Sequence, residues 1–409
     1  MNMLPMPETT PTLPLSYPFP LGPMGTPPPL VHWARKHRPV CPVTLPSGTP
    51  AWMITRKTDI AEVLTDQRFS RDLASADAPR LRGKDFTSIP GSIFNTDPPD
   101  HTRIRKVVLP YYTRAHVERY RPVITKLVTE TLDTMATGPN PTNLIEAFCE
   151  PLPPQIGCAL LRLPDKFRAG FVDNMAIQSS FDADPTDTAA ATDAVADLTH
   201  QVIQFRRDNE DDRDDPIGAL ITAREDDTLT EEEMHGTAYH LLITGVHALI
   251  PPLATGPFTL LLHDNQLRDC QREPALWPRA TEEVLRYHHN GVLGLPRIAV
   301  EDVDLHDVTI QRGDAVVATM LGATWDPEHF HNPAKFDIHR EENATATFGA
   351  GPHYCIGAAQ ARLVLTIAYQ TLFERFPTLE LAVGADEVPW DNEALFVQPL
   401  SLPVTWTTT

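Results

Sequence analysis

The 409-residue chain has few cysteines, no proline-free apolar run long enough to span a membrane, and no excess of positive charge. The five cysteines are scattered and odd in number, which argues against a disulfide framework and favours a cytoplasmic location. The longest apolar stretch, residues 241–262, contains three prolines and is expected to form a buried core helix, with no membrane span. A net charge of −20 argues against binding to nucleic acid.

Proline is concentrated at the N-terminus. Residues 1–30 hold ten of the 41 prolines, and such a proline-rich extension is expected to be extended and to lie over the surface. We expect no secretory signal, because no cationic segment followed by an apolar run is visible there. No linker or break in composition divides the remainder, so residues 31–409 are predicted to form one domain.

The distribution of apolar residues and prolines predicts a mainly α-helical chain with small β-sheets. An acidic run, residues 209–215, is interpreted as a solvated connector between two helices. The expected elements are a hairpin over 40–55, a helix over 58–64, mostly helices from 100 to 290, and short strands at 300–308, 315–319 and 395–406.

The most specific segment surrounds Cys355. Gly349 and Gly351 permit positive φ angles and the close approach of a flat ligand, and Gly357 leaves room beside the cysteine. An Ala-rich helix is predicted to follow Cys355 and to run to about residue 376. The positive end of that helix is expected to lower the pKa of the thiol.

Two alternatives for Cys355 are a buried structural cysteine and half of a zinc site with His353. No Cys-x-x-Cys or matching histidine pair completes a zinc site. The spacing Phe348-x-x-Gly351-x-x-x-Cys355-x-Gly357 instead resembles the haem-binding signature of the cytochrome P-450 family. The resemblance implies an oxidoreductase in which haem b is buried between a distal helix and the cysteine loop, with Cys355 as the thiolate ligand of the iron.

The resemblance extends from about residue 50 to the C-terminus and implies roles for further residues. Glu283, Arg286 and Arg340 resemble the family's structural Glu/Arg/Arg triad, although a Glu and an Arg three residues apart also form an ordinary exposed helix pair. The haem-contacting residues that the resemblance implies are His101, Arg105, Arg297, Phe348, Gly349, His353 and Gly357. The histidines and arginines among them are expected to bind the haem propionates, and the alternative is that each is a solvated cation.

The segment 101–126 is locally basic, with seven Lys or Arg residues and one acidic residue, Glu118. By resemblance it lies on the proximal haem face, where an acidic iron–sulfur protein docks by electrostatic steering. This implies that electrons from NAD(P)H arrive through a ferredoxin reductase and a ferredoxin. A solvated basic surface without a partner is the alternative.

The helix expected on the distal haem face, residues 234–264, departs from the family pattern of a small residue, Gly, any residue, an acid and Thr. Gly245 is retained, but His247 replaces the acid and Ala248 replaces the threonine that together relay protons to bound dioxygen. Pro251 and Pro252 are expected to bend the helix. We consider three roles for His247: a proton shuttle, a substrate anchor or a satisfied core histidine.

The missing relay favours a reaction without oxygen insertion. Segments 290–297 and 395–399 resemble bacterial enzymes that couple aromatic cyclic dipeptides, so we expect C–C or C–N coupling of tryptophan- or tyrosine-containing substrates. The alternatives are a monooxygenase that hydroxylates or epoxidises an apolar natural product, and a non-enzymatic haem sensor. The expected pocket, whose apolar members could equally be core residues, consists of Ser88, Ile89, Thr244, Leu249, Val292, Leu293, Leu295, Phe396, Val397 and Gln398.

Overall fold

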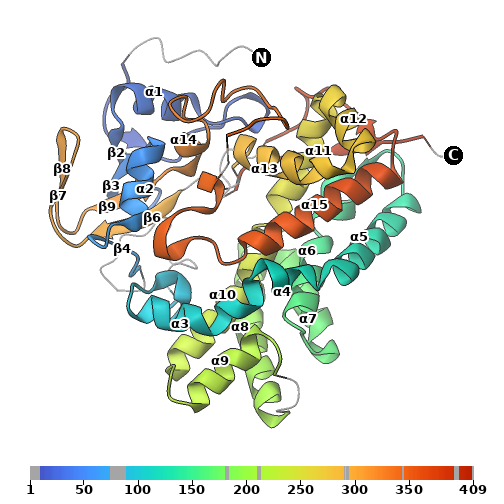
Figure 1. Cartoon of the computed structure of the whole chain (residues 1–409), viewed down its shortest axis with the longest axis horizontal. Helices are drawn as coiled ribbons and strands as arrows, with labels where there is room; N and C mark the ends of the chain where they lie inside the picture. Colours follow the sequence, from blue (N-terminus) through green and yellow to red (C-terminus); the bar gives the residue numbers. More distant parts are fainter. Residues whose placement is uncertain are drawn as a thin grey trace.

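The computed structural model describes residues 10–73, 89–179, 184–209, 213–289, 291, 294–342, 345–390 and 396–407. Within these residues the chain is mainly helical with small sheets, as predicted. Figure 1 shows a sheet-containing part beside a larger helical part. Three residues of the predicted substrate pocket, Ser88, Val292 and Leu293, lie outside the described residues.

The helices agree with the prediction that residues 100–290 are mostly helical. Several of them begin with proline at one of their first two positions, where its missing N–H leaves no hydrogen bond unmade. The α-helices are α1 (Pro29–His37), α2 (Lys57–Thr65), α3 (Asp100–Val108), α4 (Arg114–Glu118), α5 (Arg121–Ala136), α6 (Leu152–Leu160), α7 (Asp165–Ser179), α8 (Pro185–Asp208), α9 (Pro216–Glu225), α10 (Glu231–His247), α11 (Ile250–Leu262), α12 (Asp264–Arg272), α13 (Trp277–Tyr287), α14 (Met320–Thr324) and α15 (Ala358–Arg375).

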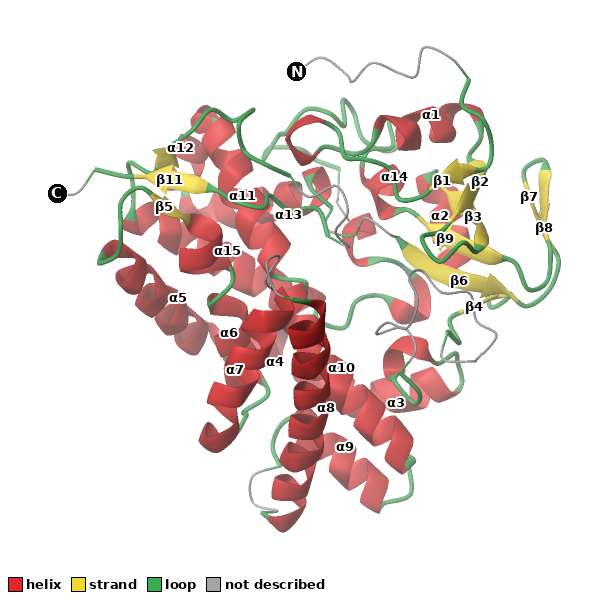
Figure 2. Cartoon of the chain, turned by 180° about the vertical axis from the view of Figure 1, so that it is seen from behind, coloured by secondary structure: helices red, strands yellow, loops and turns green. Residues whose placement is uncertain are grey.

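The strands form one larger and two smaller sheets, and the predicted N-terminal hairpin is the antiparallel pair β2–β3. The larger sheet has the order β1-β2-β3-β9-β6-β4, the second β10-β11-β5, and β7 pairs with β8 in a hairpin that projects from the sheet part (Figure 2). The strands are β1 (Leu15–Ser16), β2 (Val40–Thr44), β3 (Pro50–Ile54), β4 (Phe69–Ser70), β5 (Thr142–Asn143), β6 (Leu295–Ala299), β7 (Val303–Leu305), β8 (Val308–Ile310), β9 (Ala315–Ala318), β10 (Glu380–Leu381) and β11 (Pro403–Thr405).

The proline-rich N-terminal segment is not confined to the surface, contrary to the expectation from its composition. Its β1 strand pairs in parallel with β2, and Leu15, Tyr17 and Phe19 are buried in a cluster with residues of β2 and β3. Proline disfavours a long helix in this segment but does not prevent an extended strand from joining a sheet edge. Its apolar side chains therefore gain burial there.

One residue of the predicted acidic connector, Asp215, is buried and not solvated. Asp215 caps the N-terminus of α9, accepting hydrogen bonds from the backbone N–H groups of Ile217 and Gly218. It also pairs with Arg206 at 2.7 Å, and both side chains are fully buried. The cap and the ion pair together explain why a charged residue from this run enters the interior.

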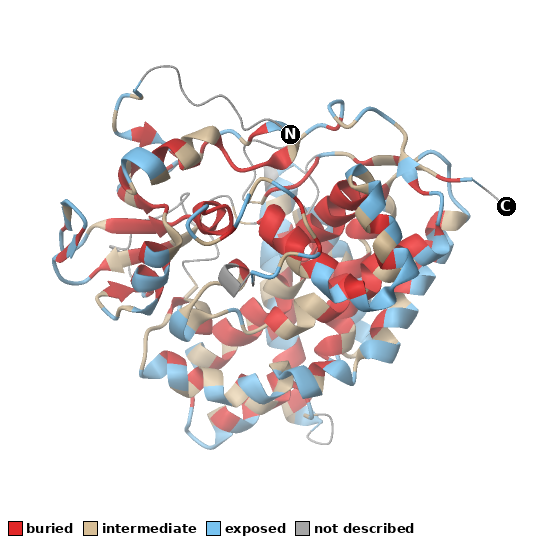
Figure 3. Ribbon diagram, turned by 45° about the horizontal axis from the view of Figure 1, so that its top comes forward, coloured by how far each residue is buried: buried red, intermediate tan, exposed pale blue. Residues whose placement is uncertain are grey.

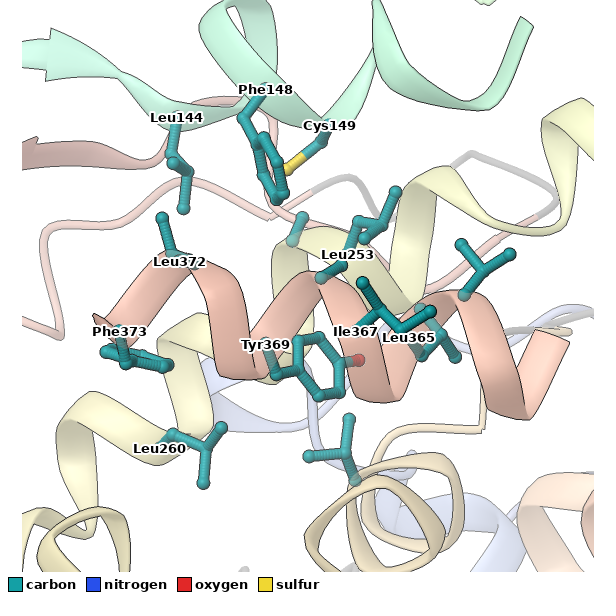
Figure 4. Packing of buried hydrophobic residues seen from close by; sticks show 14 of the residues in the cluster. Leu144, Phe148, Cys149, Leu253, Leu260, Leu365, Ile367, Tyr369, Leu372 and Phe373 are labelled. Atoms are coloured by element: carbon teal, nitrogen blue, oxygen red, sulfur yellow. The ribbon is translucent and has the colours of Figure 1, made fainter. Parts of the chain in front are cut away.

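The main hydrophobic core surrounds α15, whose buried side chains face α5, α11 and α13 (Figures 3 and 4). The hydroxyl of Tyr369 donates to the carbonyl of Pro252 at 2.6 Å. Gly256 permits this approach, because a Cβ atom there would lie 2.3 Å from the Tyr369 ring. This packing anchors α15, and so the loop that precedes it, against α11.

One described helical stretch, Glu231–Leu262, is long and apolar enough to cross a membrane by length and composition alone. Of its most apolar 18 residues, 78% are buried inside the protein. The stretch therefore belongs to the core, as predicted.

Candidate active site

The loop before α15 holds Cys355 in a conformation that its glycines make possible. Gly349 and Gly351 have φ angles of 77° and 70°, as predicted. At Gly351 a Cβ atom would lie only 2.4 Å from the carbonyl oxygen of Leu64, so a side chain cannot fit. The backbone N–H of Cys355 donates to the carbonyl of Phe348 at 3.0 Å, which closes the loop.

Cys355 differs from the other cysteines, because its side chain is exposed whereas the other four are buried. The surrounding protein still desolvates the sulfur, and this raises the pKa of the thiol. The backbone N–H of Gly357 and the charges of Arg105 and Arg362 oppose that rise but do not outweigh it. The prediction of a lowered pKa is therefore wrong, because desolvation is stronger than the helix end and the nearby cations.

Two histidines and two arginines, all buried or partly buried, form a cluster beside the cysteine loop. The rings of His101 and His353 are 4.1 Å apart. Both lose basicity, and the pKa of His101 falls to about 4 because of burial and of the charges of Arg105 and Arg297. Arg297 is 2% exposed and its pKa falls to about 10, chiefly through burial. At neutral pH the histidines are therefore uncharged, and Arg105 and Arg297 carry the positive charge of the cluster.

The same cluster has unmet hydrogen-bonding capacity. Nδ1 of His101 and Nε2 of His353 are buried and have no hydrogen-bond partner among the described residues. Arg105 reaches the loop itself, donating to the carbonyl of Tyr354 at 2.7 Å. An anionic group with several oxygen acceptors, such as a haem propionate, would satisfy both the charge and the free nitrogens.

Arg71 is a further member of this region that the sequence analysis missed. It contributes to the lowered pKa of His353, and its guanidinium donates to the carbonyls of Phe94 and Pro296. No motif or spacing in the sequence connects Arg71 with the cysteine loop. Only the pairing of β4 with β6 brings it there.

The structure brings Glu283, Arg286 and Arg340 together. Glu283 accepts two hydrogen bonds from Arg286, both at 2.7 Å, and further bonds from Nε of Arg340 at 3.2 and 3.3 Å. Arg286 also donates to backbone carbonyls, including that of Thr324. The three side chains are nearly fully buried, so they are not the exposed helix pair considered as an alternative.

The distal helix expected over residues 234–264 is present but interrupted, since α10 ends at His247 and α11 begins at Ile250. The prolines explain the interruption. Pro251 and Pro252 cannot donate to the carbonyls of His247 and Ala248, and they occupy the first turn of α11, where proline is tolerated. The interruption thus lies where the prolines predicted a bend.

The end of α10 carries Gly245, which the family pattern retains, and His247; Ala248 follows directly as the C-terminal cap. A Cβ atom on Gly245 would lie 3.7 Å from the side chain of Gln360 on α15. Ala248 is exposed although Val246 and Leu249 on either side are buried. The hydroxyl of Thr244 is occupied, because it donates to the carbonyl of His240 at 2.6 Å. No alcohol therefore stands at the position of Ala248.

His247 is partly buried and its ring nitrogen Nε2 lies 3.2 Å from Oε1 of Gln178 on α7. Burial lowers the pKa of His247 to about 4. At neutral pH the imidazole is therefore uncharged, which disfavours a shuttle that titrates near neutrality. Gln178 was not found in the sequence, because no motif marks it.

The predicted pocket residues separate into two groups. Ile89, Leu295 and Phe396 are only partly buried. Leu249 belongs to the main hydrophobic core, and Val397 is fully buried against Leu321, so core packing accounts for these two. Gln398 is 8% exposed.

Known proteins resemble this arrangement along almost the whole chain. The profile of the family described as cytochrome P-450 matches residues 165–404. Nocardicin C N-oxygenase of Nocardia uniformis subsp. tsuyamanensis is 34% identical over 374 residues, which are 91% of this chain and 94% of that protein. The chain belongs to the cytochrome P-450 family. Mycinamicin IV hydroxylase/epoxidase of Micromonospora griseorubida is 32% identical over 91% of this chain and 94% of its own length.

The fold agrees with this membership. The crystal structure of GfsF superposes with a TM-score of 0.88 at 31% identity, covering 96% of this chain and all of that one. The chain is therefore an oxidoreductase of the cytochrome P-450 family, a monooxygenase family with members in secondary metabolism, which sets the non-enzymatic sensor aside. Its cofactor is haem b, which supplies oxidising power from dioxygen with electrons that NAD(P)H provides through redox partners.

Proposed function

We propose that the chain couples aromatic cyclic dipeptides containing tryptophan or tyrosine, forming a C–C or C–N bond without inserting oxygen. Cys355 would bind the iron, and His101, Arg105, Arg297 and His353 would hold the propionates. The observation that carries the proposal is the distal turn of α10. There an exposed alanine, Ala248, stands where the family has an alcohol.

The neighbouring histidine does not replace the missing relay at neutral pH. His247 is uncharged and its Nε2 is engaged with Gln178. Both reactions consume protons at dioxygen, and they differ in where the second oxygen atom goes: insertion places it in the product, whereas coupling releases it as water. The balance is that two hydrogen atoms from the substrates, two further electrons and two further protons reduce dioxygen to two molecules of water.

The second candidate is insertion of oxygen into an apolar natural product. The printed names of the similar proteins favour it, since they include an N-oxygenase and a hydroxylase/epoxidase. In this case ordered water would provide the protons that Ala248 cannot.

A reaction under isotopically labelled dioxygen distinguishes the two. The purified haem enzyme is incubated with a tryptophan-containing cyclic dipeptide, NAD(P)H and a redox system, and products are analysed by mass spectrometry. We expect a dimer without label. A labelled monomer would refute coupling and support hydroxylation.

The substrate class is tested independently by titration of the haem absorption. Cyclic dipeptides are compared with fatty acids, terpenes and macrolactones of similar size. We expect a saturable spectral shift with aromatic cyclic dipeptides at the lowest concentration. A stronger response to a macrolactone would contradict the proposed substrate.

We further propose that a ferredoxin, reduced by a ferredoxin reductase, docks on the basic segment 101–126. Arg103 does not contribute, because it pairs with Glu233 at 2.6 Å, and Arg121 pairs with Glu118. The exposed cations without an ion pair among the described residues are Lys106, Arg114 and Arg119. This smaller surface retains the positive charge that an acidic partner requires.

Arg114→Glu tests this docking, with Arg272→Glu on α12 as a matched control on another exposed helix. We expect the first variant to slow reduction by ferredoxin about threefold or more at low salt and the control to leave it unchanged. Equal effects would reduce the role of Arg114 to general charge. We also propose a cytoplasmic location, in keeping with the five unpaired cysteines.

A further inference from the structure

Two polar side chains from distant segments meet at the end of α10. His247 is its last residue, and Gln178 lies near the end of α7. Nε2 of His247 and Oε1 of Gln178 are 3.2 Å apart. The contact joins α7 to the turn that carries Ala248, so the two side chains lie beside the distal position of the site.

Each side chain has one hydrogen-bonding group left over. Nε2 of Gln178 is buried and has no partner among the described residues. Among the described residues, the side chain of His247 makes its only hydrogen bond to Gln178, and this bond uses Nε2 alone. Because the imidazole is neutral at pH 7, it has one N–H donor and one lone-pair acceptor.

The unused groups are therefore one donor and one acceptor. With the N–H on Nε2 donating to Gln178, Nδ1 of His247 is an acceptor and the amide nitrogen of Gln178 is a donor. If the amide is turned around, both roles reverse, but the pair still offers one of each. A buried unsatisfied amide is unusual in proteins and indicates a group that a ligand or water completes.

We propose that His247 and Gln178 together bind one cis-amide edge of the substrate, one side chain accepting from its N–H and the other donating to its C=O. A cis-amide presents these two groups side by side, in the complementary order. Cyclic dipeptides contain two such amides in a six-membered ring, so this inference rests on the proposed function and names the part of the substrate that is recognised. His247 is then a positioning residue that replaces the family's acid with a substrate contact.

The test is a titration of the haem absorption of the intact enzyme with cyclo(L-Trp-L-Trp) and with its N,N′-dimethyl derivative, which lacks both amide hydrogens. We expect methylation to weaken binding to the wild type about tenfold, the factor for one neutral hydrogen bond. Gln178→Ala and His247→Ala are each expected to weaken binding of the parent compound about tenfold. In one of the two variants, the one that removes the acceptor of the substrate N–H, methylation is expected to cost no further affinity.

Asn174→Ala is the matched control, since Asn174 lies one turn earlier on α7 and its amide already donates to the carbonyl of Gly170 at 2.6 Å. It is expected to bind both compounds like the wild type. All variants are first compared with the wild type in their ferrous–CO spectrum and melting temperature. This comparison separates a lost contact from a misfolded site.

The outcomes distinguish this inference from the proposed function. If both compounds bind the wild type equally, or if the His247 and Gln178 variants bind the parent like the wild type, the amide contact is refuted, whatever product forms. If the contact is found but the cyclic dipeptide is hydroxylated with labelled oxygen, the coupling reaction fails and the contact stands. If no cyclic dipeptide shifts the spectrum, both are overturned.

Discussion

Glu283→Gln is a direct test of how the buried triad stabilises the haem-side core. The carboxylate accepts from two arginines and from the backbone N–H of Asp337 at 2.8 Å. Glutamine keeps the shape of the side chain but removes the charge and one of its two acceptors. Arg286, which has no exposed side-chain surface, and Arg340, at 6%, then lose their counter-charge.

The magnitude follows from burial. Removing one partner of a buried ion pair costs about 3–5 kcal/mol. With an unfolding entropy of about 2.1 cal/mol/K per residue, this corresponds to a fall in melting temperature of about 3–6 °C for a chain of 409 residues. The measurement is calorimetry of the haem-loaded wild type and variant at neutral pH.

Glu282→Gln is the control, because it is the same substitution one residue earlier. Glu282 pairs with Arg362, but the two side chains are 29% and 31% exposed. Water screens such a pair, so we expect a loss below about 1 kcal/mol and a shift of about 1 °C. Equal shifts for the two variants would refute the reasoning that burial of the triad determines its contribution.

Four other variants test separate parts of the structure. Cys355→Ala should lose the thiolate-type spectrum of the ferrous–CO complex, and its persistence would disprove the assignment of the ligand. Ala248→Thr should raise the labelled fraction of product, since it adds an alcohol at an exposed position; an unchanged fraction would show that the missing alcohol does not determine the reaction. Gly256→Ala should lower the free energy of unfolding by about 1–3 kcal/mol, because the new methyl group would overlap the ring of Tyr369; a wild-type melting curve would contradict this overlap. Burial lowers the pKa of His288 from 6.5 to about 4, so its neutral form stabilises the fold above pH 6.5, and this stability is lost as pH falls towards 4. Between about pH 7.5 and 5 the free energy of unfolding of His288→Gln should therefore fall by about 2 kcal/mol less than that of the wild type. If the free energies of unfolding of the two proteins change with pH in parallel, this expectation is contradicted.

The positions of glycine and proline in the sequence predicted several backbone features of this protein. The glycines before Cys355 predicted positive φ angles, and the prolines after Ala248 predicted the interruption of the distal helix. Both predictions depend on backbone sterics within a few residues, which operate in any context. The residues of the triad were identified through the family resemblance, and the structure places them in contact.

Only the tertiary structure decided the properties that depend on distant segments. Arg71 joins the cationic cluster through strand pairing, and Gln178 meets His247 across 69 residues of sequence. The pKa of the Cys355 thiol was predicted with the wrong sign, because the helix end is visible in the sequence whereas desolvation is not. The sequence alone thus predicted the backbone of the cysteine loop, through local sterics, and indicated the family, through the resemblance of its motif. Folding decided which polar groups are desolvated and which remain unpaired, because both depend on the surrounding atoms from all parts of the chain.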